Sequence, residues 1–407
     1  MLSKFLVFAP FILAMIMPGC ESCDSSMPLS PTSISAENKS PTANPISEAK
    51  ETMGEILGNG QPTEAPKVIN GVELMSIHGW WANIYPWDYI PEKSAVHPVS
   101  RLWTPYQKPS PFQMMEQCRQ IKDFGGGAVV LEYSPNQNLD WHNYWLSNDF
   151  VNGCGSFFLL YEHINGTRFI PANDGPKDMN NPYNRKVFKD DIDFIFKNVI
   201  VPYQSRYITM NGRAVIYMWS SVQMTGDFAS LLLEAKDKYP VFFIGSEGML
   251  GLPKRPEDLE RVKALDGFME YSLGGPANYM KAVQDYRAGS YKWRQLLRNI
   301  EVETGKKHLL IPTFQAAYDD TKVPGRTNPA MYPRSLEEME YHARLIKDAM
   351  GTVYDRVGPF VVYELPEGAA VIESQCTPET VNRRGRYTGC GLGRLEVLSK
   401  FFGRGAW

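Results

Sequence analysis

Eight short apolar segments alternate with helix-like stretches between residues 74 and 364, and this alternation limits the folds open to the chain. The segments are rich in β-branched, aromatic and Leu residues and nearly free of charge, as is typical of strands buried on both faces of a parallel sheet. Eight such strands with crossovers predict an α/β fold, a (β/α)8 TIM barrel forming a single domain with long βα loops. The predicted strands are Leu74–Asn83, Gly127–Tyr133, Ser156–His163, Ala214–Trp219, Val241–Ser246, Gly267–Ser272, His308–Gln315 and Phe360–Glu364.

Helices are expected in the gaps between these strands. A doubly wound open sheet is the structural alternative, but it predicts a Gly-rich phosphate turn after the first strand, and the sequence has none there. The gap Asn136–Gly155 shows no clear helix and is long and aromatic. The predicted helices are Pro111–Phe124, Lys186–Tyr203, Phe228–Lys238, Pro256–Ala264, Tyr279–Glu303 and Ser335–Met350.

The N-terminal residues predict export. Lys4 precedes the apolar run Phe5–Met17, which is too short to span a bilayer, and Met17-Pro18-Gly19-Cys20 resembles a bacterial lipobox. We predict a lipoprotein signal peptide over residues 1–19 and acylation of Cys20, for example with palmitate; ordinary cleavage with loss of Cys20 is the alternative. Residues 20–66 are rich in Ser, Pro and Thr and predict a disordered tether, followed by the barrel domain at 67–407.

Charge and cysteine content narrow the partners and the compartment. The net charge is −3 without a basic excess, so we expect no nucleic-acid partner, membrane contact through the lipid anchor only, and a monomer. The predicted location is the bacterial cell envelope, lipid-anchored at the outer membrane on its periplasmic or surface face. In that oxidising compartment Cys376 and Cys390 are a predicted disulfide. Cys118 and Cys154 are placed mid-helix and before a strand, so no bond is predicted between them.

Acidic and aromatic residues follow most of the predicted strands. The carboxyl ends of barrel strands meet at the catalytic face, so these side chains should converge there. Rings stack on sugar faces and carboxylates bind hydroxyl groups, so the pattern predicts a carbohydrate cleft; the alternative is the ordinary polar rim of a barrel. The strand-end residues with this character include Tyr133, Tyr161, His163, Glu247, Glu270 and Gln315. Substrate binding is assigned to Tyr85, Trp87, Glu132, Trp141, His142, Glu162, Trp219, Tyr271 and Asp319.

Two carboxyl groups astride the scissile bond are what glycoside hydrolysis generally needs. Glu364 and Glu367 follow the eighth strand, and Pro366 and Gly368 break that strand so that a turn can bring both acids to one centre. They are the predicted catalytic pair. Two alternatives stay open: solvated loop acids at these positions, or Glu132 and Glu162 as the pair. No cofactor or metal is predicted, because the sequence has no zinc-type spacing and Asp319-Asp320 offers too few calcium ligands.

The stretch Tyr363–Gly368, with Glu373 beyond it, is similar to the N-E-W-H-E-G-T-x-I-E stretch of the endo-α-mannosidase family, glycoside hydrolase family 99. Tyr85-Pro86-Trp87, Gly212–Tyr217 and Ile311–Asp320 resemble further motifs of that family in the same order. The resemblance implies a retaining (β/α)8 glycosidase that uses the substrate's own 2-hydroxyl as nucleophile. Glu364 would then be the base, Glu367 the acid, and Tyr271 a hydrogen-bonding partner of the reacting sugar.

The sequence departs from the family pattern beside the catalytic pair. Leu365-Pro366 stands where the family has Trp-His, and Tyr363 stands where it has Asn. Two function classes therefore follow: a glycoside hydrolase acting on α-mannoside-like or related polysaccharide, and a non-catalytic barrel that binds glycan.

Overall fold

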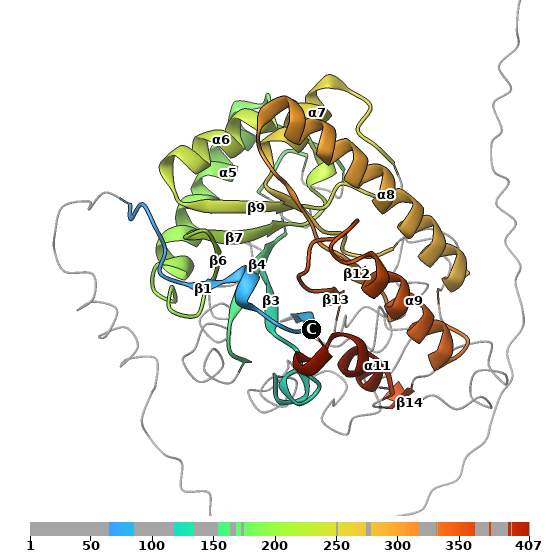
Figure 1. The fold of residues 1–407 in the computed structure, drawn as a ribbon. Coiled ribbons are helices and arrows are strands. Elements are labelled where there is room, and N and C mark those ends of the chain that lie inside the picture. Colours follow the sequence, from blue (N-terminus) through green and yellow to red (C-terminus); the bar gives the residue numbers. More distant parts are fainter. Residues whose placement is uncertain are drawn as a thin grey trace, which may run out of the picture. The chain divides into compact units, whose positions relative to one another are not determined.

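Parallel strands form a ring in the computed structural model, as the alternation in the sequence predicts (Figure 1). The structure describes residues 65–84, 118–133, 154–162, 168–171, 175–249, 251–273, 278–316, 331, 333–362, 374–375, 390–391 and 393–406. Contacts group Glu64–Trp407 as one unit. The ring consists of β2 (Trp81–Ile84), β3 (Ala128–Tyr133), β4 (Phe157–Tyr161), β7 (Arg213–Met218), β9 (Val241–Gly245), β10 (Gly267–Phe268), β11 (Leu309–Leu310), β12 (Thr313–Phe314) and β13 (Phe360–Val362).

The ring closes through one strand that is split in two. β11 pairs with β10, β12 pairs with β13, and β13 pairs with β2, each in parallel. Across the break, Ile311 donates its N–H to the Phe268 carbonyl at 2.9 Å, and the Pro312 carbonyl accepts from the Phe360 N–H at 2.9 Å. Because Pro312 has no N–H to donate, the ladder is interrupted there without leaving a backbone donor unpaired. The predicted (β/α)8 barrel is confirmed.

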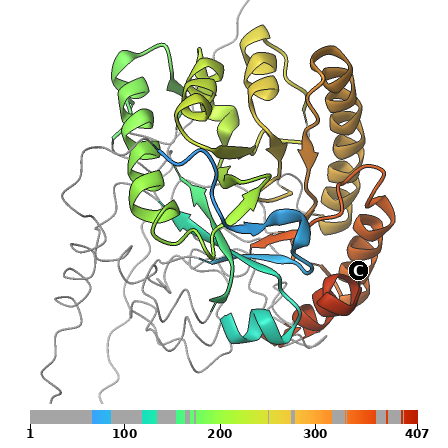
Figure 2. The ribbon, with the colours of Figure 1, turned by 60° about the vertical axis from the view of Figure 1, so that its left-hand side comes forward.

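Helices lie outside the strands (Figure 2). In α8, the buried residues recur every three or four positions, so one stripe of the helix faces the sheet. The named helices of the described residues are α5 (Pro182–Ile195), which continues as the π-helical turn η2 (Phe196–Ile200), α6 (Phe228–Lys238), α7 (Pro256–Ala264), α8 (Tyr279–Thr304), α9 (Leu336–Ala349) and α11 (Gly393–Phe402). Within the described residues, no helix combines the length and apolarity needed to cross a membrane.

Large rings fill the barrel interior. Trp81 on β2 meets Phe158 on β4 edge to face, with ring centroids 5.6 Å apart, and Tyr217 on β7 meets Phe360 on β13 at 5.5 Å. Neither pair comes from neighbouring strands, so both contacts cross the interior. The barrel is therefore a packed core closed beneath its mouth.

Short additional elements decorate the ring. β6 (Ile208–Met210) pairs antiparallel with β7 and parallel with β1 (Val72–Glu73). β5 (Lys177–Asp178) pairs with β8 (Met224–Thr225), and β14 (Ser374–Gln375) with β15 (Cys390–Gly391). In the described part of the chain there are also the 3-10 turns η1 (Leu74–Ser76), η3 (Ser221–Gln223) and η4 (Arg404–Ala406). The first predicted strand was too long, because its beginning forms η1 and β2 starts at Trp81.

Cys118 and Cys154 form a disulfide, so the expectation that they would stay apart was wrong. The predicted surroundings of both cysteines are nevertheless confirmed, since Cys118 lies in the helical segment 118–123 and Cys154 precedes β4. The buried face of that helical segment is turned toward the start of β4, and the two Cα atoms are 4.7 Å apart. A distance of this size suits a disulfide.

Candidate active site at the barrel mouth

Acidic side chains gather at the carboxyl ends of four strands. Glu132 ends β3, Glu162 follows β4, Glu247 follows β9 and Glu270 follows β10, and each is at most 7% exposed. Glu132 shares its register with Leu160 and Tyr217, and Tyr217 points into the barrel, so Glu132 belongs to the inward-facing row. Burying four carboxyl groups at one end of a barrel is costly unless they are bonded or used.

Two half-buried rings lie beside these acids. Trp219, just after β7, and Tyr271, just after β10, meet edge to face with centroids 5.9 Å apart. Tyr271 also contacts Phe360 on β13 at 6.5 Å. The two predicted sugar contacts, Trp219 and Tyr271, are therefore brought together, and β13, which leads toward Glu364, lies against one of them.

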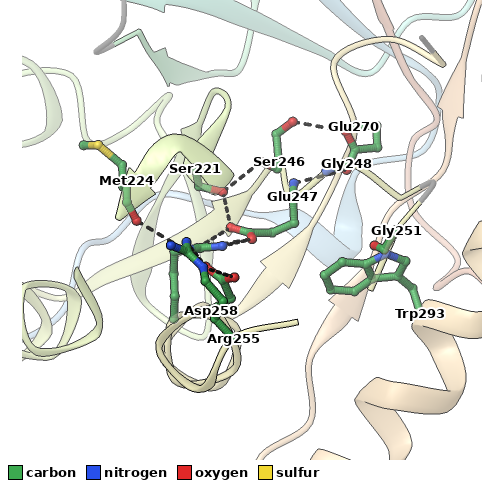
Figure 3. A network of polar contacts seen from close by, with 11 residues as sticks. Ser221, Met224, Ser246, Glu247, Gly248, Gly251, Arg255, Asp258, Glu270 and Trp293 are labelled. Carbon is green, nitrogen blue, oxygen red and sulfur yellow. Dashed lines mark hydrogen bonds and ion pairs between the residues drawn. The ribbon is translucent and has the colours of Figure 1, made fainter. Parts of the chain in front are cut away.

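Glu270 is held by neutral donors. One carboxyl oxygen accepts from the backbone N–H groups of Glu247, at 3.2 Å, and Gly248, at 2.9 Å, while the other lies 3.2 Å from the Ser246 hydroxyl (Figure 3). Burial nevertheless raises the pKa of Glu270 to about 8, with a smaller contribution from neighbouring Glu247. With this pKa most of the carboxyl group is protonated at neutral pH, while the Ser246 hydroxyl donates to it.

Glu247 turns its side chain away from Glu270 and into a buried ion pair. Arg261 of α7 donates to Glu247 at 2.6 Å and to Asp258 at 2.9 Å, and the Ser221 hydroxyl donates to Glu247 at 2.6 Å (Figure 3). Breaking such a pair would leave an uncompensated buried charge, so it fixes the loop after β9 to α7. Sequence reasoning missed this pair, because Arg261 lies within a helix and nothing local marks it as the partner of a strand-end acid.

Not every residue expected at the mouth faces it. Tyr161 donates its hydroxyl to Asp191 of α5 at 2.7 Å, and Tyr133 stacks on Phe194 of α5. Side chains alternate along a strand, so when Glu132 and Glu162 face inward, the adjacent tyrosines face the outer helices. Gln315 does belong to the mouth region, where its side-chain oxygen accepts from the Leu273 N–H at 3.2 Å.

Several predicted residues lie outside the described part of the chain: Glu364, Glu367, Tyr85, Trp87, Trp141, His142, His163, Asp319, Cys20 and Cys376. Of Cys390 only the backbone, in β15, is described. Their assignments stay predictions. Among the described residues, no group of three or more His, Cys, Asp or Glu side chains is placed to hold a metal ion.

No protein-family model matches the chain, and no curated protein matches it. Solved structures with a similar backbone include a β-mannanase of glycoside hydrolase family 113 from Alicyclobacillus acidocaldarius, at 9% identity and a TM-score of 0.43 over 80% of this chain and 96% of that one. A family 5 xyloglucanase from Paenibacillus pabuli matches at 9% identity and a TM-score of 0.42, over 81% and 99%. A family 39 glycoside hydrolase from Bacteroides cellulosilyticus matches at 12% identity and a TM-score of 0.42, over 73% of this chain and 60% of that one. With TM-scores below 0.5, these likenesses leave function to be inferred from the side chains.

Proposed function

We propose that the protein is an exported, lipid-anchored glycoside hydrolase of the endo-α-mannosidase type, cleaving α-mannoside-like or related glycan linkages with retention. The observation that carries the proposal is the presence of three buried acids, Glu132, Glu162 and Glu270, and two half-buried rings at the carboxyl ends of the barrel strands. Rings that contact the apolar face of a sugar, beside carboxyl groups that bind its hydroxyls, suit a carbohydrate better than an apolar or strongly anionic substrate.

The reaction itself is assigned to Glu364 and Glu367. Strand β13 ends at Val362, two residues before Glu364, and its Phe360 touches Tyr271. This contact supports a location for the pair near the rings, because a chain can travel only a few ångströms per residue.

The residue roles follow the family resemblance. Glu364 takes the proton of the sugar 2-hydroxyl, and the freed oxygen attacks the anomeric carbon as the glycosidic bond breaks. Glu367 gives its proton to the leaving oxygen, then takes one from the water that attacks the anomeric carbon, while Glu364 returns its proton to the 2-oxygen. Trp219 stacks on a sugar ring, and Tyr271 hydrogen-bonds the reacting sugar.

A barrel that binds glycan without cleaving it is the second candidate. Leu365-Pro366 favours it, because the family has Trp-His between its two acids. Both candidates use the same mouth, so only turnover separates them.

Reducing-sugar release from a panel of mannans and related polysaccharides tests the proposal. We expect Glu364→Gln and Glu367→Gln each to lower the turnover of the cleaved polysaccharide by about 10²- to 10⁴-fold, because each removes a proton-transfer group. Glu301→Gln, on the exposed side of α8, is the matched control and should keep wild-type turnover. Binding without turnover in the wild type and in both variants would exclude the hydrolase and support the binding barrel.

A further inference from the structure

The ring of Tyr271 is placed by side chains on neighbouring strands, because it lies beyond the end of β10. Before it, the Glu270 carbonyl accepts from the Thr313 hydroxyl at 2.6 Å. After it, the Leu273 N–H donates to the side chain of Gln315 at 3.2 Å. A binding group keeps its geometry only when such neighbouring contacts lock it. The position of the Tyr271 ring therefore depends on how residues 270 and 273 are held.

Of these attachments, the Glu270 side chain makes the most bonds. It crosses to the loop after β9, where it accepts from the N–H groups of Glu247 and Gly248 and from the Ser246 hydroxyl (Figure 3). Because its backbone carbonyl is bonded to β12, Glu270 joins the ends of β9, β10 and β12. Tyr271 is the next residue along the chain, so a shift of Glu270 is passed on to its ring.

The groups that face the Glu270 carboxyl group leave it without a counter-ion. From the loop after β9, Glu247 presents its backbone N–H, while its carboxylate is paired with Arg261. The charge of Glu270 also reaches the hydroxyl groups of Tyr217 on β7 and Tyr286 on α8. Burial raises the pKa of both, that of Tyr286 to about 12. Within the described residues, no Lys, Arg or His forms an ion pair with Glu270. An ionised Glu270 would therefore be a buried charge compensated only by neutral donors.

Loss of the Glu270 proton creates this unfavourable state. Burial raises the pKa of the carboxyl group to about 8 although three donors face it, so burial outweighs those donors. A carboxylate here is stabilised by turning toward the water of the mouth, since 7% of the residue is already exposed. That turn breaks the bonds to Glu247 and Gly248 and carries Tyr271 away from Trp219.

We propose that Glu270 is a positioning residue: in its protonated form it holds Tyr271 against Trp219 in the geometry that contacts the sugar, and in its ionised form it releases the ring. The inference rests on the proposed role of Tyr271 in glycan binding. It adds a residue that does not touch the glycan but sets the pH range in which the mouth is ordered for it. The change belongs to weakly alkaline pH, where neither Tyr217 nor Tyr286 loses its proton.

Fluorine NMR of the full chain, labelled with 5-fluorotryptophan, tests the proposal without a ligand. The Trp219 signal is identified by its loss in Trp219→Phe, and it reports the edge-to-face contact with Tyr271. We expect this signal in wild type to shift between pH 6 and pH 9.5 with a midpoint at about 8. In Glu270→Gln it should keep its pH 6 position throughout, because the amide oxygen still accepts from the two N–H groups and the amide does not ionise.

Two further variants separate positioning from a general structural effect. Ser246→Ala removes a donor that lowers the pKa of Glu270, so the midpoint should move to higher pH. Glu301→Gln, exposed on α8, should titrate like wild type. Lys236, whose pKa burial lowers to about 8, titrates in the same range at the other end of the barrel, but every variant retains it. Far-UV circular dichroism at each pH checks that the barrel stays folded.

Two outcomes of the fluorine experiment would overturn the positioning role. One is a Trp219 signal that stays constant with pH in wild type, and the other is an equal shift in wild type and Glu270→Gln. If Glu270→Gln does not fold, Ser246→Ala decides, since an unchanged midpoint contradicts the role.

Calorimetric titration with an α-linked mannotriose extends the test to the glycan. Wild type should bind it about tenfold more weakly at pH 9.5 than at pH 6.5, through loss of one ring contact and its hydrogen bond, and Glu270→Gln should lose much less affinity. Equal losses in both proteins would contradict the proposal. Absence of binding at either pH would instead count against the mannoside function, while the Trp219 signal still decides the role of Glu270.

Discussion

Glu270 places a protonated acid at the mouth, and this predicts a pH dependence of stability. Its pKa rises from the ordinary 4.5 to about 8 in the folded state. Between these values the folded state binds the extra proton, so the free energy of unfolding falls as pH rises through the window. Glu270→Gln keeps an oxygen for the two N–H donors and removes the titration. From pH 5 to pH 8, wild type should lose about 3 kcal/mol relative to this variant.

Urea unfolding of both proteins at pH 5, 6.5 and 8 measures the difference. Other groups that titrate in this range, such as Asp191, whose pKa burial raises to about 6, are present in both proteins and cancel. Parallel stability curves across the three pH values would mean that Glu270 is ionised in the folded protein.

Tyr271 is predicted to act through its hydroxyl group. Tyr271→Phe keeps the ring contacts with Trp219 and Phe360 and removes the hydroxyl group that we propose hydrogen-bonds the reacting sugar. We expect kcat to fall about tenfold, the equivalent of one hydrogen bond, with little change in stability. Tyr291→Phe, exposed on α8, is the control. Steady-state kinetics with the cleaved polysaccharide measure kcat for both variants. An unchanged kcat in Tyr271→Phe would mean that Tyr271 contributes packing only.

The strand-end acids were predictable from sequence, because a carboxylate that directly follows an apolar strand lies at the carboxyl end of the barrel, where all the strands end. Their partners were not. Ser246 and Glu247 reach Glu270 and Arg261 only after two strands and a helix have packed together. The wrong assignment of Tyr133 and Tyr161 to the mouth has a simpler cause, since alternation along the strand sends every second side chain outward.

At the scale of single elements, local signals predicted the bounds of two helices, whereas the helix predicted from Lys186 begins at Pro182. Helices α6 and α7 begin and end where the sequence predicts, because Asp227 caps the first and Pro256 occupies the first turn of the second. The hairpin of β6 and β7 was overlooked although Asn211-Gly212 marks it. Both residues have positive φ, 53° and 71°, as a tight hairpin turn requires.

The Cys118–Cys154 disulfide ties a helical segment to the start of β4 across 36 positions of sequence. Loop-closure entropy predicts that Cys118→Ser with Cys154→Ser loses about 3–4 kcal/mol of stability. Denaturant unfolding measures this loss, and thiol titration should find two fewer reactive cysteines in the double variant after unfolding and reduction.

A reductant supplies the control for that element. It should destabilise the wild type more than the double variant, and any effect that remains in the double variant reports the predicted Cys376–Cys390 bond. If reductant leaves the stability of the wild type unchanged, the Cys118–Cys154 disulfide makes no contribution to it.

Over the whole molecule, the two ends of the barrel are built differently. At the amino-terminal end, Asp266 is surrounded by Lys236 at 2.8 Å, Lys306 at 3.2 Å and Arg213 at 3.3 Å. At the mouth, Glu270 is bonded by a hydroxyl and two backbone N–H groups. Asp266 is thus fully ion-paired, whereas Glu270 is bonded by neutral groups and the ion pair of its neighbour Glu247 is turned toward α7. This contrast agrees with the usual division of a barrel into a stabilising and a reactive face.

Closure of the ring makes a prediction that an open sheet would not. When β11 and β12 are counted as one split strand, each strand of the ring has a partner on both sides. We call the region where this split strand and β13 join β10 to β2 the seam. The N–H groups of Ile311, Phe360 and Trp81 are bonded there in the same way as those of the central strands. Native-state hydrogen exchange should therefore give these three amides protection within about tenfold of Ile216 on β7. An open sheet has edge strands, whose amides exchange by local fraying. If Ile311 and Phe360 exchange through such low-energy openings while Ile216 needs global unfolding, the seam is open in solution and β13 no longer holds its position against Tyr271.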